Sequence, residues 1–244
     1  MNFYIFLFFI FILSSIITFF TPNSSFKGGS LSSSSPSIPK QLKIYVINLD
    51  RRKDRLENVN KQLKDLEYTR ISAIDGKTIS NSNKYKYISQ KGLNETDFGL
   101  KLTNGAIGLG ITFYNILNEH KSDDDFIIFE DDITLKYFDY NKLQKYLQDI
   151  DYDIIYLGHH KLSNKKSLTK ISDNLYKSNG QVNGTFGLLI SGKNKQKILN
   201  EMYPLNWQID TALYMSPNLN RYILFPPMVT SPPSHENSSD IQYD

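Results

Sequence analysis

The chain has 244 residues, a net charge of +3 and no cysteine. The small net charge argues against a nucleic-acid-binding protein. The lack of cysteine excludes disulfides, thiolate zinc sites and cysteine nucleophiles. The length beyond an apolar N-terminal segment suffices for one α/β domain with a sizeable core.

The N-terminal segment predicts a membrane anchor. Residues 3–20 contain no charged side chain and are about long enough to span a bilayer. We therefore expect residues 1–21 to form a transmembrane signal-anchor, with a cleaved signal peptide as the alternative. Residues 22–40 are rich in Ser, Pro and Gly and predict a flexible stalk. The remaining domain, 41–244, would then face the lumen of the secretory pathway (ER or Golgi), in a single-pass type II arrangement.

The domain begins with an apolar strand predicted at 42–49. The helix after it has one apolar face, which is made by Leu56, Val59, Leu63 and Leu66. Arg51, Arg52 and Arg55 lie at the carboxyl end of the strand and in the first helical turn, where open α/β sheets bind ligands. Guanidinium groups suit phosphate oxygens, although arginines at a helix start can also be plain surface residues.

Further along, strands and helices alternate. We expect strands at 69–73, 126–129, 153–158 and 186–190, helices near 104–120, 140–150 and 193–203, and a polar loop at 77–98. This alternation predicts an α/β fold with helices on both faces of a sheet.

The strand at 126–129 runs directly into three acids, Glu130, Asp131 and Asp132. Three adjacent carboxylates repel one another, so their clustering suggests a counter-cation. Glu130 and Asp132 fall on the same side of an extended chain. Two hard oxygen ligands suit Mg²⁺ or Mn²⁺, with substrate phosphates completing the shell. A solvated acidic turn is the alternative.

Several short blocks, in this order, resemble glycosyltransferase family 25, which includes lipooligosaccharide and procollagen galactosyltransferases. The blocks are 48–52 with Arg55, 73–76, 102–108, 129–132, 153–158, 184–191, Asp210, 226–227 and 239–242. The resemblance covers roughly 42–242. It implies a GT-A type nucleotide-sugar-binding domain with a mixed, mostly parallel sheet, and a hexosyltransferase that inverts at the sugar carbon.

The resemblance also implies roles for individual residues. Asp132, Glu130 and Asp240 would hold Mn²⁺ or Mg²⁺ on the diphosphate of a UDP-sugar. Asp210 would be the base that takes the acceptor proton, with a helix N-cap as its alternative role. Trp207 would stack on a sugar or pack in the core. The donor-binding residues would be Asn48, Asp50, Arg52, Arg55, Asp75, Gly76, Glu130 and Asp131.

The expected reaction moves galactose or glucose to a glycan, lipid-linked or hydroxylysine acceptor. The chain departs from the family pattern Gly-Glu-x-Gly-Cys followed by Ser-His, because the corresponding residues are Ala106, Leu109, Thr112 and Phe113. An alternative function is therefore a catalytically inactive module that binds a glycan or a partner. A metal-dependent nucleotidyltransferase is a third hypothesis.

Overall fold

The computed structural model describes residues 41–94, 101–147, 150–160, 162 and 165–232. The predicted signal-anchor, the stalk and Asp240 lie outside these residues. Within the described residues, none of the helices is long and apolar enough to cross a membrane.

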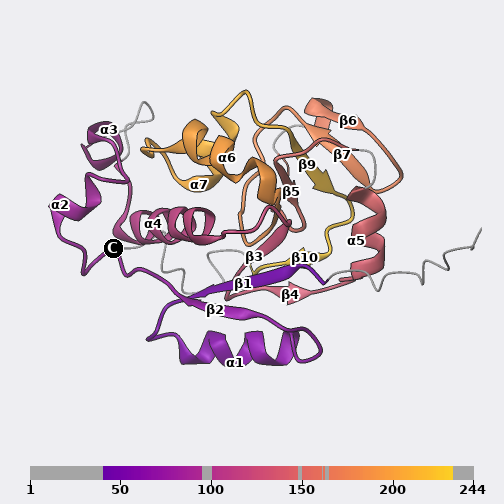
Figure 1. The fold of residues 1–244 in the computed structure, drawn as a ribbon, viewed down its shortest axis with the longest axis horizontal. Helices are drawn as coiled ribbons and strands as arrows, with labels where there is room; N and C mark the ends of the chain where they lie inside the picture. The colour runs from indigo at the N-terminus through magenta and orange to yellow at the C-terminus, as the bar shows by residue number, and fades with distance from the viewer. Residues whose placement is uncertain (1–40, 95–100, 148–149, 161, 163–164, 233–244) are drawn as a thin grey trace, which may run out of the picture. The chain divides into compact units, whose positions relative to one another are not determined.

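The domain is built around a mixed sheet whose order, within the described residues, is β2-β1-β3-β8-β5-β9-β7-β6 (Figure 1). Its strands are β1 (Lys43–Asn48), β2 (Thr69–Ser72), β3 (Phe126–Glu130), β5 (Ile154–Tyr156), β6 (Leu168–Lys170), β7 (Leu175–Ser178), β8 (Gly187–Ile190) and β9 (Arg221–Leu224). A separate antiparallel pair joins β4 (Thr134–Leu135) to β10 (Val229–Thr230).

Most strands of the large sheet share one direction. β2, β1, β3, β5, β9 and β6 run one way, and only β8 and β7 among the described strands run the other way. The expected mixed, mostly parallel sheet is confirmed. The sequence did not indicate that β8 is antiparallel, because periodicity predicts a strand and not its direction.

Helices cover both faces of the sheet, as predicted. The helices are α1 (Lys53–Gln62), α2 (Asn81–Lys84), α3 (Gln90–Asn94), α4 (Asn104–Glu119), α5 (Tyr140–Leu147), α6 (Lys195–Met202) and α7 (Ile209–Tyr214). Short 3₁₀ turns lie at Lys165–Ser167 and Gly192–Asn194. Apolar residues of α4, α6 and α7 pack on one face, and those of α1 and α5 pack on the other.

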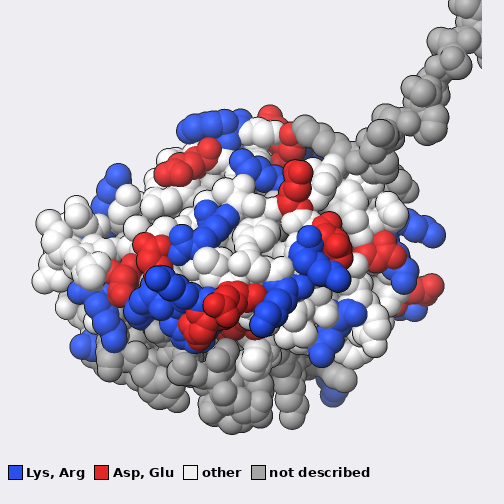
Figure 2. Space-filling model, turned by 90° about the horizontal axis from the view of Figure 1, so that it is seen from below, with Lys and Arg blue, Asp and Glu red and all other residues white. Residues whose placement is uncertain are grey.

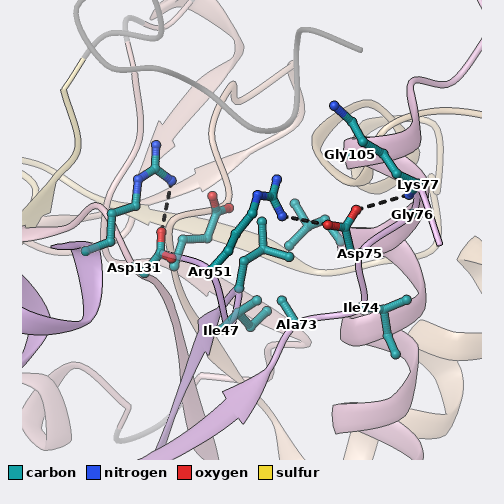
Figure 3. A pocket seen from close by; sticks show the side chains of 13 residues that line it. Ile47, Arg51, Ala73, Ile74, Asp75, Gly76, Lys77, Gly105 and Asp131 are labelled. Carbon is teal, nitrogen blue, oxygen red and sulfur yellow. Dashed lines mark hydrogen bonds and ion pairs between the residues drawn. The ribbon is translucent and has the colours of Figure 1, made fainter. Parts of the chain in front are cut away.

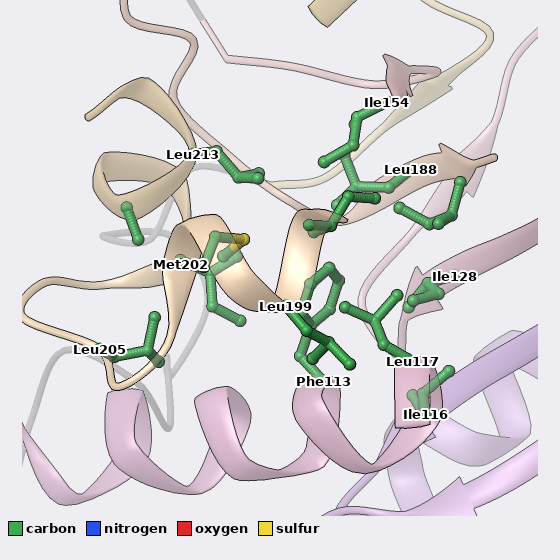
Figure 4. Packing of buried hydrophobic residues seen from close by; sticks show 14 of the residues in the cluster. Phe113, Ile116, Leu117, Ile128, Ile154, Leu188, Leu199, Met202, Leu205 and Leu213 are labelled. Atoms are coloured by element: carbon green, nitrogen blue, oxygen red, sulfur yellow. The ribbon is translucent and has the colours of Figure 1, made fainter. Parts of the chain in front are cut away.

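The core on the α4 side is continuous from helix to sheet. Figure 4 shows Phe113 and Leu117 of α4 beside Ile128 of β3 and Leu188 of β8, with Leu199 of α6 completing the contact. All of these side chains are buried. The core therefore fixes α4 against the sheet. The amino-terminal half of α4 reaches the edge where the candidate site lies.

The predicted loop at 77–98 is wrong, because α2 and α3 form there. Tertiary hydrogen bonds hold these short helices. The Ser89 amide donates to the Leu205 carbonyl at 3.0 Å, and the Leu102 amide donates to the Gly92 carbonyl at 2.9 Å. The stretch is mostly polar, so the sequence pattern could not reveal these helices, which depend on contacts between distant segments.

The surface does not gather one sign of charge on the face shown in Figure 2. Basic and acidic side chains are interspersed there. This mixture agrees with the small net charge of the chain.

Candidate active site

The candidate site lies at the carboxyl edge of the sheet. Asn48 at the end of β1 is in register with Ser72 of β2, and Ile47 is in register with Glu130 of β3. The antiparallel strand β8 brings Thr185 to the same edge, where its hydroxyl donates to Glu130 Oε1 at 2.8 Å. Residues from four segments of the chain therefore meet at one place.

Asn48 is a buried junction between these segments. Its Nδ2 donates to Asp131 Oδ2 at 2.7 Å and to the Arg52 carbonyl at 3.0 Å. Its Oδ1 accepts a hydrogen bond from Arg70 Nε at 2.9 Å. Asn48 therefore ties the β1–α1 turn to β2 and to the acidic turn, and has few sites left for a ligand.

Asp131 is also engaged within the protein. Arg55 Nη1 contacts its Oδ1 at 3.0 Å, and Asn48 contacts its other oxygen. Burial raises the pKa of Asp131, while the hydrogen bonds from Asn48 and Arg55 oppose this effect. Since both oxygens already accept hydrogen bonds, Asp131 is suited to hold the acidic turn against α1.

A pocket opens beside this junction, between β1, α4 and the segment after β2 (Figure 3). Its lining comprises Ile47, Leu49, Arg51, Arg55, Ala73, Ile74, Asp75, Gly76, Lys77, Gly105, Leu109, Glu130 and Asp131. Arg51 Nη1 contacts Asp75 Oδ2 at 2.6 Å, and the Lys77 amide donates to Asp75 Oδ1 at 3.1 Å. The pocket therefore combines apolar walls with cationic groups and an acid.

Asp50 and Arg52, both predicted to bind the donor, do not line this pocket. Arg52 forms an ion pair with Asp54, with Nη2 to Oδ2 at 2.9 Å. Asp50 accepts hydrogen bonds from Arg70 and Ser72, and the contact with Arg70 lowers the pKa of Asp50. In contrast, Asp75, Gly76, Arg55, Glu130 and Asp131 do line the pocket, as does Arg51.

A cluster of carboxylates adjoins the pocket at Glu130. Burial, followed by the neighbouring charges of Asp132, Asp131 and Asp210, raises the pKa of Glu130 to about 8. Asp132 Oδ1 is buried and has no hydrogen-bond partner among the described residues. Glu130, Asp132 and Asp210 therefore lie close enough for their charges to interact.

Asp210 is the second residue of α7, and Gln208 occupies the N-cap position. The alternative role of Asp210 as the helix N-cap is therefore wrong. Its Oδ1 accepts a hydrogen bond from the Thr211 amide at 2.7 Å. Asp210 lies close enough to Glu130 and His160 for its charge to raise the pKa of both groups.

Within the described residues, no three acidic or histidine side chains converge in an arrangement that would hold a metal ion. Two carboxylates do fit a hard cation that takes its other ligands from substrate phosphates, as Mg²⁺ commonly does. The unpartnered oxygen of Asp132 and the raised pKa of Glu130 fit such a site.

Three further side chains at this edge were not predicted as site residues. His160 is half-buried, packs on Phe186 at 4.9 Å between ring centroids, and is close enough to Asp132 and Asp210 to interact with their charges. Burial lowers the pKa of His160, while the two acids oppose that shift. Thr185 and Lys77 are the other two. In the sequence, Thr185 lies within the family block 184–191, and His160 follows the strand predicted at 153–158.

Trp207 lies outside the pocket lining. Lys91 Nζ lies 5.8 Å from the centroid of its indole ring. The indole Nε1 is buried without a hydrogen-bond partner among the described residues. One face of the ring is therefore already in contact with a cation.

The departures from the family pattern lie mainly in the core. Ala106 and Phe113 are buried in the cluster between α4 and the sheet. Thr112 is buried and bonded to the segment after β2. Only Leu109 of the four lines the pocket. These departures therefore alter packing more than they alter the pocket surface.

The profile described as "Glycosyltransferase family 25 (LPS biosynthesis protein)" matches residues 41–213. Procollagen galactosyltransferase 1 of Danio rerio is 30% identical over 171 residues, covering 64% of this chain and 28% of that protein. Procollagen galactosyltransferase 2 of Homo sapiens is 26% identical over 181 residues, covering 67% and 29%. The chain thus spans less than a third of the length of these relatives.

Similarity to solved structures is low. Galactosyltransferase LgtC in complex with donor and acceptor sugar analogues aligns with a TM-score of 0.35 and 17% identity, covering 70% of this chain and 69% of that one. The inositol-1-phosphate CTP transferase from T. maritima aligns with a TM-score of 0.39 and 10% identity, covering 78% and 69%. The profile match, which extends over most of the sequence, shows that the chain belongs to glycosyltransferase family 25.

Proposed function

We propose that the chain is a metal-dependent inverting glycosyltransferase of the GT-A type that moves galactose or glucose from a UDP-sugar to an acceptor. Family membership supports the reaction class. The observation that carries the proposal is the position of Glu130, which belongs both to the pocket lining and to the carboxylate cluster. A donor bound in the pocket would thus present its diphosphate and sugar to the acids.

The pocket has the chemistry that a nucleotide requires. Ile47, Leu49 and Leu109 supply apolar surface for a flat base. Arg51 and Lys77 supply positive charge for phosphate oxygens. Asp75 is an acceptor of the kind that ribose or base donors need. Because Arg51 is paired with Asp75 across the pocket, donor binding would exchange this ion pair for a contact with phosphate.

Asp132 and Glu130 would hold Mn²⁺ or Mg²⁺, and we propose that Asp240 contributes a further ligand. When bound, the ion would offset the charge that develops on the departing nucleoside diphosphate. Without it, two carboxylates and the diphosphate would repel one another. The protein contributes the turn that fixes these acids, through the bonds of Asp131 to Asn48 and Arg55.

Asp210 would accept the proton of the acceptor hydroxyl while that oxygen bonds to the sugar carbon and the bond to UDP breaks. One such base suffices for inversion. Its carboxylate accepts a hydrogen bond from the Thr211 amide and interacts with the charge of Glu130, which supports this role.

The acceptor class follows from the relatives by analogy. The family description names LPS biosynthesis, and the curated relatives are procollagen galactosyltransferases. We propose a glycan, lipid-linked or hydroxylysine acceptor. We also propose that residues 3–20 anchor the enzyme as a single-pass type II protein in the ER or Golgi membrane.

A panel of UDP-sugars tests the proposal. The full-length chain in detergent is incubated with Mn²⁺ and each sugar, and both donor binding and donor hydrolysis are measured. We expect one UDP-hexose to bind and to be slowly hydrolysed without acceptor. A chain that neither binds nor hydrolyses any member of the panel contradicts the proposal. Donor binding without transfer to glycans, lipids or collagen-like peptides would favour the inactive module instead.

A further inference from the structure

Residues 73–77 form a strap that makes one wall of the pocket. All five of its residues line the pocket, and Asp75 within it is paired with Arg51 (Figure 3). The strap follows β2 directly and has no strand or helix of its own. Its position therefore depends on contacts with β1 and with α4.

Close packing holds the strap against α4. A Cβ atom added to Gly76 would lie 1.8 Å from the carbonyl oxygen of Asn104, in the first turn of α4. A Cβ atom added to Gly108 would lie 2.2 Å from the carbonyl oxygen of Ile74. Two glycines thus allow the two backbones to touch, and the other side of the strap is tied to β1 by the Ala73 amide, which donates to the Asn48 carbonyl at 2.9 Å.

The Thr112 side chain makes the remaining link. Its Oγ1 accepts a hydrogen bond from the Ile74 amide at 2.8 Å and donates to the Gly108 carbonyl at 2.8 Å. The residue is 1% exposed and does not line the pocket. A hydroxyl has one hydrogen and can accept as well, so both of these bonds are satisfied at once. The donation to Gly108 orients the oxygen so that it faces the strap.

We propose that Thr112 is a positioning residue for the donor nucleotide, acting through the strap and without touching the ligand. The inference rests on the proposed function, since it takes the pocket as the nucleotide site. The strap carries Asp75 and Lys77 into that pocket. The hydrogen bond from the Ile74 amide to Thr112 fixes the position of the strap relative to α4. Loss of the hydroxyl would leave the strap free to shift while the helix stays in the core.

The test compares Thr112→Val, which removes the hydroxyl at nearly equal size, with Thr112→Ser, which keeps it. Ile111→Val is the matched control, because it removes one buried methyl from the same helix without a hydrogen bond to the strap. Calorimetry with UDP and Mn²⁺ on the full-length chain gives the Kd, and amide hydrogen exchange reports the strap in the absence of ligand. UDP-sugar turnover at saturating donor is measured in parallel.

We expect Thr112→Val to raise the Kd for UDP about tenfold, the size expected for one lost hydrogen bond. Exchange at residues 74–77 would accelerate, and turnover at saturating donor would remain near that of the wild type. Thr112→Ser would restore the Kd and the exchange rates, and Ile111→Val would change neither.

Equal UDP affinity and equal strap exchange in Thr112→Val and wild type would overturn the inference while leaving the proposed function intact. Uniformly faster exchange throughout the domain, matched by Ile111→Val, would also overturn it, because Thr112 would then serve stability alone. A wild-type chain that does not bind UDP would overturn the proposed function, and the positioning role with it.

Discussion

Three successive carboxylates at the end of β3 have three different surroundings. Glu130 accepts a hydrogen bond from Thr185, and Asp131 is held by Asn48 and Arg55. Asp132 Oδ1 has no hydrogen-bond partner in the part of the chain that the structure describes. Among the three, Asp132 therefore has the oxygen that is most available to an added cation.

Replacing Asp132 tests this availability. Asp132→Asn keeps the side-chain size but removes one charge from a hard-cation site. We expect the affinities for Mn²⁺ and for UDP-sugar to fall together, with little change in melting temperature. Titration with Mn²⁺ followed by calorimetry measures both. An unchanged Mn²⁺ titration would mean that the cluster is only a solvated acidic turn.

Asp210→Asn should damage a different step. Donor and metal affinity should remain close to those of the wild type, while transfer falls by roughly 10²–10⁴-fold if Asp210 is the base. Initial rates at saturating donor, divided by the folded fraction, provide the measurement. A lower melting temperature with unchanged transfer per folded molecule would assign Asp210 to the stability of α7.

His120 allows a prediction about pH and stability. Its Nε2 lies 3.0 Å from the Asp124 carbonyl and must carry the hydrogen, so its Nδ1 accepts from the Tyr45 hydroxyl at 3.0 Å. Burial lowers the pKa of His120 below its ordinary value of 6.5. As the pH falls through 6.5, the unfolded chain gains this proton before the folded chain does.

Stability from the neutral His120 is therefore complete above the unfolded pKa and declines on acidification. We expect the melting temperature of the wild type to fall between about pH 7 and about pH 5 more steeply than that of His120→Gln, which has no titrating ring. Parallel melting curves at several pH values measure the difference. Identical slopes in the two proteins would contradict the prediction.

At the level of elements, the sequence predicted those whose apolar period is strong. β1, α1, β3, α4 and α6 form close to where their patterns place them. It did not predict α2, α3 or α7, which are short, or β6, β7 and β9, which depend on pairing with distant strands. Short elements gain their stability from tertiary contacts, and these leave little local pattern.

The candidate site was predictable to a similar degree. The three acids after β3 were found from the apolar strand that runs into them, and Asp75 and Gly76 were found because they lie in a family block. The ion pairs that site residues form within the protein were not predicted. Nothing in the sequence shows that Arg52 pairs with Asp54, or that Asp131 is held by Arg55. The folded geometry decides which acid each arginine pairs with, and a one-dimensional pattern does not contain that geometry.

The contact between the strap and α4 gives a prediction at this scale. Gly108→Ala would place a Cβ atom against the Ile74 carbonyl, so we expect a loss of about 1–3 kcal/mol of stability and weaker UDP binding. Gly187→Ala in β8 is the control, because its Cβ would meet its nearest atoms at an ordinary 3.5 Å. Chemical denaturation and UDP calorimetry compare the two. Equal losses of stability and UDP affinity in the two variants would show that close packing between the strap and α4 is not required.

At the level of the whole molecule, the two apolar cores lie on opposite faces of one sheet and depend on it in common. The chain ahead of the domain is expected to serve a separate purpose, as a membrane anchor and a stalk. The domain from residue 41 should consequently keep its fold when that segment is absent.

The anchor can be tested directly in cell membranes. Residues 3–20 should keep the chain in the pellet after alkaline carbonate extraction, because an apolar span of this length resists removal from lipid. Immunoblotting of pellet and supernatant provides the measurement. Release at full mass would count against a span, and release at a mass smaller by about 20 residues would indicate a cleaved signal.

The late position of β8 in the sequence also delays completion of the sheet during synthesis on the ribosome. Until Gly187–Ile190 emerge, β3 has a partner on one side only, and its other edge offers free amides and carbonyls to any passing strand. Until then, the hydrogen bond from Thr185 to Glu130 cannot form either. A chain that terminates after β5 would therefore leave one edge of β3 unpaired and would lack the hydrogen bond from Thr185 to Glu130.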